Sequence, residues 1–217
     1  MGVDREIEPA ASQLAYRELE RQIVTLELVP AALTTEAALI ERVGLGRTPV
    51  REAIQRLAWE GLLEVRPRSG IAVAPLNPSD WMRVLDVRLG VEPVLARAAA
   101  RLGTGDLAQA FRQAGSLMES AARRMDVAGF LQADKALDDA LAQASDNPFA
   151  ARLAAPLQSH SRRFWFRYQA RAGLAPAAAR HIALVEAIVS GDEAVAAAAA
   201  AHLVEMLKRQ AARALLG

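Results

Sequence analysis

Arginines in the N-terminal third of the chain have a spacing that suits base recognition. Arg47 and Arg51 lie four residues apart, so on a helix they would project from the same face, and Arg56 follows further along. A guanidinium can donate two parallel hydrogen bonds to O6 and N7 of guanine in the major groove, and a helix N-terminus favours phosphate. The alternative is an ordinary solvated helix face.

The residues before these arginines predict a short helix and a tight turn. Thr35 is a candidate N-cap, and Leu39 and Val43 follow at helical spacing. Gly44 can adopt the left-handed conformation that ends a helix, and Leu45 would fill the turn. A second helix is therefore expected almost at once, over residues 46–59 or 48–59.

The second helix and the residues after it complete a recognisable unit. Val50, Ile54 and Leu57 would form its buried face and leave the arginines outside. Residues 63–65 and 71–73 alternate as two strands, and residues 66–70 between them have the composition of a turn with basic side chains. Helix, turn, helix and a β-hairpin wing form a module that reads DNA.

Residues 33–73 resemble the winged helix-turn-helix of the GntR regulators, most clearly in the run GRTPVREAIQRLAWEGLLEVRPRSG. The resemblance implies that Arg47 and Arg51 reach base edges, that Thr48 holds phosphate and that Ser69 and Gly70 at the wing tip enter the minor groove. Two departures from the family occur at Ala37, where some relatives have a DNA-contacting arginine, and at Gly46, where a Ser or Thr is usual. The complete set of candidate DNA contacts is Arg47, Thr48, Arg51, Arg56, Arg68, Ser69 and Gly70.

A proline-rich segment at residues 75–80 predicts a boundary between two domains, at residues 1–75 and 76–217. The second part has helical signals throughout, at residues 80–102, 105–124, 127–144, 147–172, 177–189 and 192–216. Helices with short connections predict an antiparallel bundle, which can hold a ligand or metal in its interior. The fold class is therefore mainly α, with one small β-hairpin wing.

Acidic and imidazole side chains in the second part could hold a metal. Asp134 and Asp138 lie four residues apart on one predicted helix face, and His181 and His202 lie on the last two helices. Solvated carboxylates and hydrogen-bonded core histidines are the alternative.

Three runs, at residues 83–100, 131–148 and 180–206, resemble the FCD domain, the FadR C-terminal type that follows this wing in one GntR branch. In metal-binding members one Asp and three His hold a divalent ion, and these positions fall on Asp134, Asp138, His181 and His202. Asp138 stands where the family has His, which favours a harder ion such as Mn²⁺ while tolerating Zn²⁺ or Ni²⁺. Alternatively, the site has lost its metal and the extra carboxylate pairs with a protonated histidine or an arginine.

Arg88 and Glu92 match the Arg-x-x-x-Glu pattern of the FCD family, and a guanidinium facing the bundle could bind the carboxylate of an effector. An exposed ion pair one helical turn apart is the alternative. One of the arginines at 162, 163 and 167 is also expected to face the cavity, and Arg163 is assigned to the effector.

Composition bounds the class of protein. The chain of 217 residues is 53% hydrophobic and 24% charged, which is typical of a globular protein, and it has no cysteine for a disulfide or thiolate metal site. No secretion signal or membrane span is recognised, so we expect a cytoplasmic location. Residues 1–75 have nine arginines against eleven acids, a net charge of −2, but six arginines lie within residues 42–68. The positive charge is therefore local.

Two functions follow from these features. The first is a transcription regulator, a homodimer that reads a palindromic operator and responds to a small carboxylate-containing effector in the helical domain. The second is a helical metalloenzyme that uses Asp134, Asp138, His181 and His202. No acid, base or nucleophile stands out beside the four candidate ligands, which favours the regulator.

Overall fold

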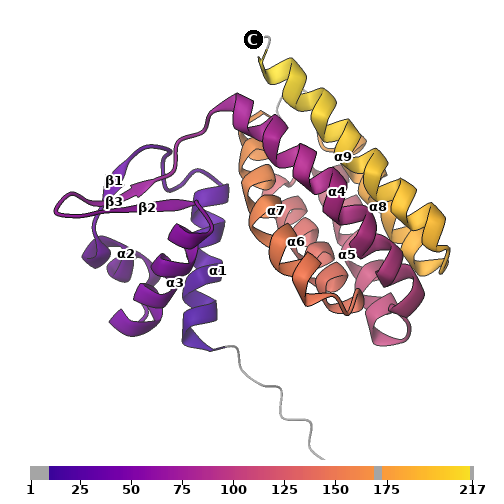
Figure 1. Cartoon of the computed structure of the whole chain (residues 1–217), viewed down its shortest axis with the longest axis horizontal. Coiled ribbons are helices and arrows are strands. Elements are labelled where there is room, and N and C mark those ends of the chain that lie inside the picture. The colour runs from indigo at the N-terminus through magenta and orange to yellow at the C-terminus, as the bar shows by residue number, and fades with distance from the viewer. Residues whose placement is uncertain (1–9, 169–172, 216–217) are drawn as a thin grey trace, which may run out of the picture. The chain divides into compact units, whose positions relative to one another are not determined.

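The computed structural model describes residues 10–168 and 173–215. The chain divides into two compact units, Met1–Leu76 and Asn77–Gly217. Each unit has its own elements, which Figure 1 labels along the chain.

In its described residues, the first unit combines three helices with a small antiparallel sheet. The strand order is β1-β3-β2, and Val65 of β2 lies opposite Ile71 of β3. The two helices and the hairpin predicted from the sequence are confirmed. The elements are α1 (Ala11–Val24), β1 (Leu33–Thr34), α2 (Glu36–Val43), α3 (Arg47–Trp59), β2 (Leu63–Arg66) and β3 (Gly70–Val73).

Local signals fix both ends of α2. The Oγ1 of Thr35 accepts a hydrogen bond from the backbone N–H of Ala38 at 3.1 Å, which satisfies one of the free donors of the first turn. Gly44 ends the helix with a left-handed φ of 71°, and its N–H donates to the carbonyl of Ile40. Because this turn is tight, α3 begins three residues later at Arg47.

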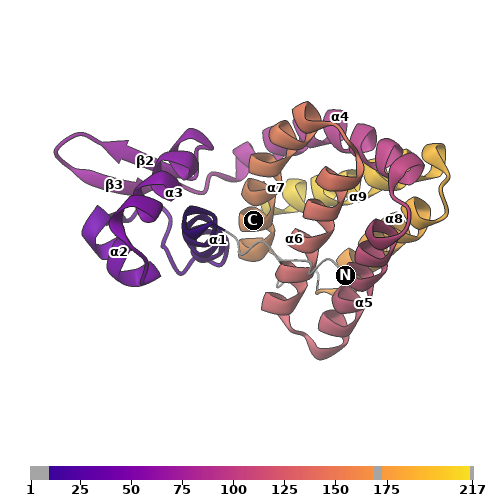
Figure 2. The ribbon, with the colours of Figure 1, turned by 90° about the horizontal axis from the view of Figure 1, so that it is seen from below.

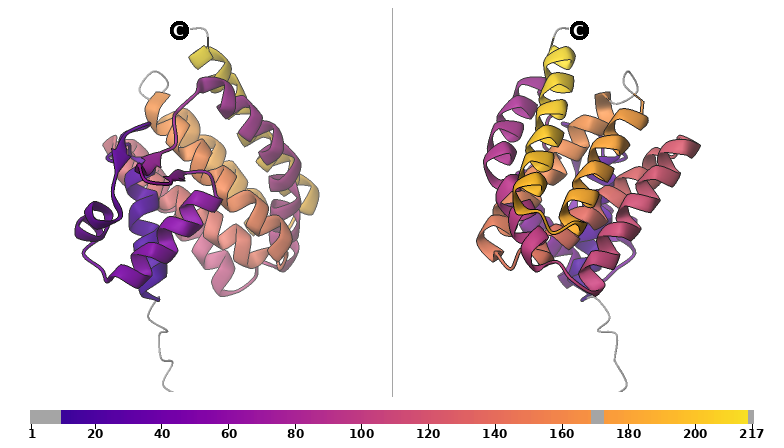
Figure 3. Two further views of the ribbon diagram at one scale, coloured as in Figure 1. Left: turned by 60° about the vertical axis from the view of Figure 1, so that its left-hand side comes forward. Right: turned by 90° about the vertical axis from the view of Figure 1, so that its right-hand side faces the viewer.

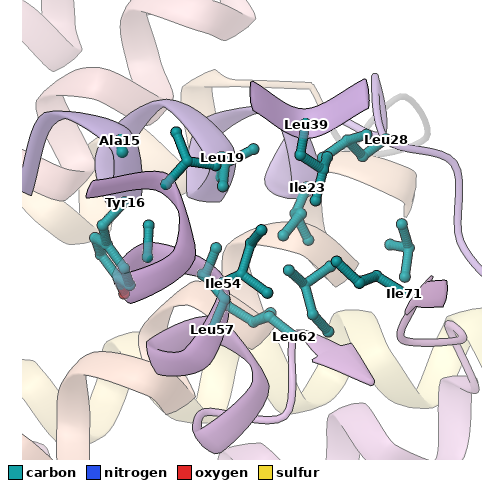
Figure 4. Packing of buried hydrophobic residues seen from close by; sticks show 14 residues of the cluster. Ala15, Tyr16, Leu19, Ile23, Leu28, Leu39, Ile54, Leu57, Leu62 and Ile71 are labelled. Carbon is teal, nitrogen blue, oxygen red and sulfur yellow. The ribbon is translucent and has the colours of Figure 1, made fainter. Parts of the chain in front are cut away.

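Helix α1 and strand β1 were not predicted, yet both belong to this unit. Figure 4 shows Leu19 and Ile23 of α1 pointing into the same apolar cluster as Leu39 of α2 and Ile54 and Leu57 of α3. All five of these side chains are buried. Helix α1 thus supplies one wall of the core that holds α3 in place.

The second unit consists, in its described residues, of six helices. They are α4 (Pro78–Leu102), α5 (Asp106–Arg124), α6 (Val127–Ala144), α7 (Pro148–Tyr168), α8 (Ala175–Val189) and α9 (Glu193–Leu215). The predicted all-helical bundle is confirmed. The predicted extension of α7 to residue 172, after Tyr168, and that of α9 to residue 216 fall outside the described residues.

The helices of the second unit form neighbouring pairs. Helix α4 packs along α9 and α7, and α5 packs along α6 and α8. Figure 2 shows α6 between α5 and α7, and Figure 3 shows α9 alongside α4 and α8. No helix in the described part of the chain combines the length and the apolar character needed to cross a bilayer.

Candidate nucleic-acid interface and buried charge cluster

The N-terminal half of α3 presents arginines to solvent. The side chains of Arg47 and Arg51 are 73% and 55% exposed, whereas Val50 and Ile54 on the opposite face are buried. The predicted orientation of this helix is confirmed. The core described above therefore holds two guanidinium groups outward on the leading turns of α3.

A carboxylate of α2 contacts both arginines. Oε1 of Glu36 lies 2.8 Å from Nε of Arg51 and 4.0 Å from Nε of Arg47. The Arg51 side chain is nevertheless 55% exposed, so part of it remains open to solvent. Glu36 thus restrains the direction of Arg51 without covering it.

The wing lies beside these arginines. Arg51 and Gln55 of α3 line a groove of about 530 Å³ together with Arg66 and Arg68 of the wing. Arg66 is paired with Glu64 at 2.7 Å, whereas Arg68 has a positive φ of 63° and an exposed side chain at the tip. The hairpin loop extends beyond the sheet in Figures 1 and 2. Thr48 and Ser69 are also exposed.

Gly70 has a structural reason to be glycine. Its φ is 96°, and a Cβ built on it would lie 2.6 Å from the backbone oxygen of Thr34. The wing is thereby held against β1, so Gly70 shapes the wing whether or not its backbone contacts DNA.

Arg56 is placed differently from the other predicted DNA contacts. Its guanidinium lies 3.8 Å from the ring centroid of Tyr16, and its Nε lies 2.9 Å from Glu60 Oε1. The other oxygen of Glu60, Oε2, accepts a hydrogen bond from the Tyr16 hydroxyl. These contacts link α3 to α1. The structure therefore gives Arg56 a role in packing, and its contact with DNA stays a prediction.

Ionisable side chains gather inside the second unit. We call Arg88 and Glu92 of α4, Asp134 and Asp138 of α6, Arg162 of α7 and His181 of α8 the buried charge cluster. Arg88 donates from Nε to Glu92 Oε1 at 2.6 Å, and both side chains are buried, so the alternative of an exposed pair is wrong. Gln158 Nε2 lies 3.4 Å from the same oxygen.

Arg162 connects the two carboxylates of α6. Its Nη1 donates to Asp138 Oδ2 and lies 3.5 Å from Asp134 Oδ2, and its Nη2 donates to Ser159 Oγ at 3.1 Å. The Arg162 side chain is only 7% exposed. The second alternative from the sequence, in which the extra carboxylate pairs with an arginine, is the arrangement that the structure contains.

His181 faces two acceptors. Its Nε2 lies 2.8 Å from Asp134 Oδ1 and its Nδ1 lies 2.8 Å from the backbone oxygen of Ala177. Both ring nitrogens therefore lie at hydrogen-bond distance from an oxygen. Burial alone would lower the pKa of His181, but the hydrogen bond to Asp134 and its charge raise it.

The pKa values of the two carboxyl groups of α6 shift in opposite directions. Burial and the neighbouring Asp134 raise the pKa of Asp138 to about 7, although Arg162 opposes the shift. Burial would also raise the pKa of Asp134, but its hydrogen bond with His181 and the charges of His181 and Arg162 hold it well below its usual range. Asp134 is therefore the fixed negative charge of the cluster.

A small cavity adjoins the cluster. Its volume is about 20 Å³, and its lining includes Arg88, Asp134, Arg162 and His181 with the aromatic rings of Phe130 and Trp165. A space of this size holds about one water molecule. Arg162 thus faces the cavity. The neighbouring Arg163 is buried, does not line the cavity, and has a pKa lowered to about 10 by burial.

The predicted metal ligands are only partly brought together. Asp134, Asp138 and His181 lie in the cluster, but His202 is exposed on α9, because Leu203, Val204 and nearby residues take the buried face. Among residues 10–168 and 173–215, no group of three or more His, Cys, Asp or Glu is arranged to hold a metal ion. Arg162 occupies oxygens of both carboxylates, and His202 lies apart from them, so these residues do not fit a divalent ion as they stand.

Comparison with known families agrees with both units. Residues 11–73 match the bacterial regulatory proteins of the gntR family, and residues 83–206 match the FCD domain. The chain belongs to the GntR family. As a GntR protein with an FCD domain it is a DNA-binding transcription regulator. The alternative of a metalloenzyme is not supported, since the family consists of regulators.

The relatives of this GntR protein are named as transcription regulators, and the match extends over most of their length. The galactonate operon transcriptional repressor of Escherichia coli is 29% identical over 88% of this chain and 93% of its own. An HTH-type transcriptional regulator of Streptomyces ambofaciens is 30% identical over 82% of this chain and 75% of its own. The solved structure of E. coli McbR/YncC has a TM-score of 0.78 over 93% of this chain and 99% of its own, at 18% identity, and this likeness concerns the fold.

Proposed function

We propose that this GntR protein is a ligand-responsive repressor that binds a palindromic operator as a homodimer. The observation that carries the proposal is the exposed arginine pair on the leading turns of α3, beside a groove that the basic wing also lines. Residues 1–75 would bind DNA, and residues 76–217 would bind the effector and the second protomer. We place the protein in the cytoplasm, where its target DNA is.

Within the DNA-binding part, Arg51 is the principal base contact. Its side chain is 55% exposed beside Glu36, and a guanidinium can form two parallel hydrogen bonds to guanine. Arg47 reads the neighbouring base, and Thr48 contacts phosphate at the N-terminus of α3. Arg68, Ser69 and the backbone of Gly70 enter the minor groove.

A homodimer follows from the size of the reading surface. One α3 helix contacts only a few base pairs, whereas two copies related by a two-fold axis read two half-sites and gain the affinity that an operator requires. A dimer would also let an effector in each helical domain change the spacing of the two reading helices.

The effector that the pocket supports is a small organic acid. Two guanidinium groups, of Arg88 and Arg162, line the cavity, and guanidinium binds carboxylate through two parallel hydrogen bonds. The relative named for the galactonate operon is consistent with a sugar acid. The earlier assignment of Arg163 to the effector is less well supported, because Arg163 does not line the cavity.

Selection of bound sequences from random DNA, followed by titration of the best sequence, tests the DNA-binding part. Arg51→Ala should lower the discrimination between operator and random DNA by about 5- to 150-fold per half-site, since a good base contact contributes about 1–3 kcal/mol. Arg17→Ala, which removes an exposed arginine of α1, is the matched control. If Arg51→Ala keeps the wild-type ratio, α3 does not read bases through this residue.

A further inference from the structure

The strongest unexplained feature of the molecule is a guanidinium placed between two buried carboxylates. Arg162 comes from α7, and Asp134 and Asp138 come from α6, so the contact joins two helices inside the bundle. Ser159 holds the other terminal nitrogen of the same side chain.

The oxygens of Asp134 are already shared between two partners. Oδ1 faces His181 and Oδ2 faces Arg162. A metal at this place would have to separate Asp134 from His181, and it would need Arg162 to leave. His202 could contribute nothing, since its side chain is exposed on α9.

The side chains of the cluster are already paired within the chain. Glu92 faces Arg88, Asp138 faces Arg162, and Asp134 lies between Arg162 and His181. A divalent ion would add two positive charges to this buried group and displace a guanidinium that is 7% exposed. A displaced buried charge without a partner is strongly unfavourable.

We propose that Arg162 takes the place of a divalent metal ion, so that the pocket of this FCD domain assembles without metal and presents guanidinium groups to an incoming anion. Asp138, a carboxylate where the family has an imidazole, is then the partner that Arg162 requires. The first half of the proposal stands on the contacts alone, and the second half, the binding of an anion, rests on the proposed function.

Metal analysis of the full chain, purified without a histidine tag or chelator, tests the first half. We expect far less than one Mn, Ni or Zn per protomer and a melting temperature that EDTA and these ions leave unchanged. One ion per protomer, or a melting temperature that falls in EDTA and returns with the ion, would overturn the proposal. If the same purified protein fails to bind any sequence selected from random DNA, that result counts against the proposed function and not against this proposal.

Substitution of Arg162 tests the role of its charge. Arg162→Met should melt about 10 °C lower, because breaking a buried ion pair is strongly destabilising, and Mn²⁺ or Zn²⁺ should restore part of the loss. Arg152→Met, on the exposed side of α7, should melt like the wild type. An Arg162→Met protein as stable as the wild type in EDTA would refute the proposal. If Arg162→Met does not fold, the metal content of the wild type decides the question.

Discussion

Glu36→Gln should make this regulator bind random DNA more tightly while it distinguishes its operator less well. Glu36 places a carboxylate 2.8 Å from Arg51 and 4.0 Å from Arg47, at the centre of the surface that must approach phosphates. In loose, non-specific binding this carboxylate competes with phosphate for the guanidinium groups and repels the backbone. In the proposed operator complex, the same carboxylate would hold Arg51 in the direction that a base requires.

The magnitude follows from the exposure of the pair. The side chains of Glu36 and Arg51 are 34% and 55% exposed, so their interaction is of the surface kind, worth about 0.2–1 kcal/mol. Loss of this interaction in both protomers of a dimer corresponds to an increase of about 2- to 30-fold in the affinity for random DNA. The slope of log affinity against log salt should also steepen, by up to about 0.9 per protomer.

Fluorescence anisotropy with operator and random duplexes over a range of salt concentrations measures both quantities. Glu41→Gln removes another exposed carboxylate of α2 and controls for the change in net charge. If Glu36→Gln binds random DNA no better than Glu41→Gln does, the carboxylate does not restrain the reading arginines.

Three further predictions concern stability and the effector. Gly70→Ala should lower the free energy of unfolding by about 1–3 kcal/mol, because its Cβ would lie 2.6 Å from the Thr34 oxygen at a φ of 96°. Gly90→Ala, in open space on α4, should be neutral or stabilising; urea titration compares the two variants, and equal stability would contradict the close approach. Arg88→Ala should lower the free energy of unfolding by about 3–5 kcal/mol, because Glu92 stays buried without its partner, and the double variant Arg88→Met with Glu92→Leu should recover most of this loss. The operator complex of the double variant should no longer respond to organic acids, and a response that persists would exclude Arg88 from the effector site. The pKa of Asp138 is raised to about 7 and that of His181 is also raised, so the folded chain holds protons at these two groups that the unfolded chain releases. The free energy of unfolding should therefore fall as the pH rises through 7, and the fall should be smaller in Asp138→Asn.

The helix-turn-helix could be predicted from the sequence because its signals are local. Thr35 caps α2 and Gly44 ends it, each through contacts within four residues along the chain. The apolar spacing of α3 then fixes which face is buried. Strand β1 has only two residues, Leu33 and Thr34, and forms because they pair with β3. Thr34 lies opposite Ile71, 37 residues later in the chain, so no local pattern predicts this strand. Helix α1 did have a signal, in Leu19 and Ile23, that could have been used.

The contents of the helical pocket were harder to predict, since they depend on the rotation of each helix. Arg162 and Arg163 are adjacent, and about 100° of helix rotation decides which of them lines the cavity. His202 matched a family position, but the apolar neighbours that follow it turn it outward. The spacing of Asp134 and Asp138 correctly predicted a shared face, whereas their partner, 24 residues after Asp138, came from another helix.

The small volume of the cavity has a consequence for the timing of a response. A space of about 20 Å³ has no room for an organic acid, so the ion pairs around it must open before or as the ligand enters. The observed rate of effector binding should then level off at high ligand concentration, at the rate of opening, instead of rising in proportion. Part of the binding free energy is used to open the cluster, so the apparent affinity is weaker than the contacts alone would give. Under the proposed function, such a regulator would respond to sustained, high concentrations of its ligand and ignore brief or small ones.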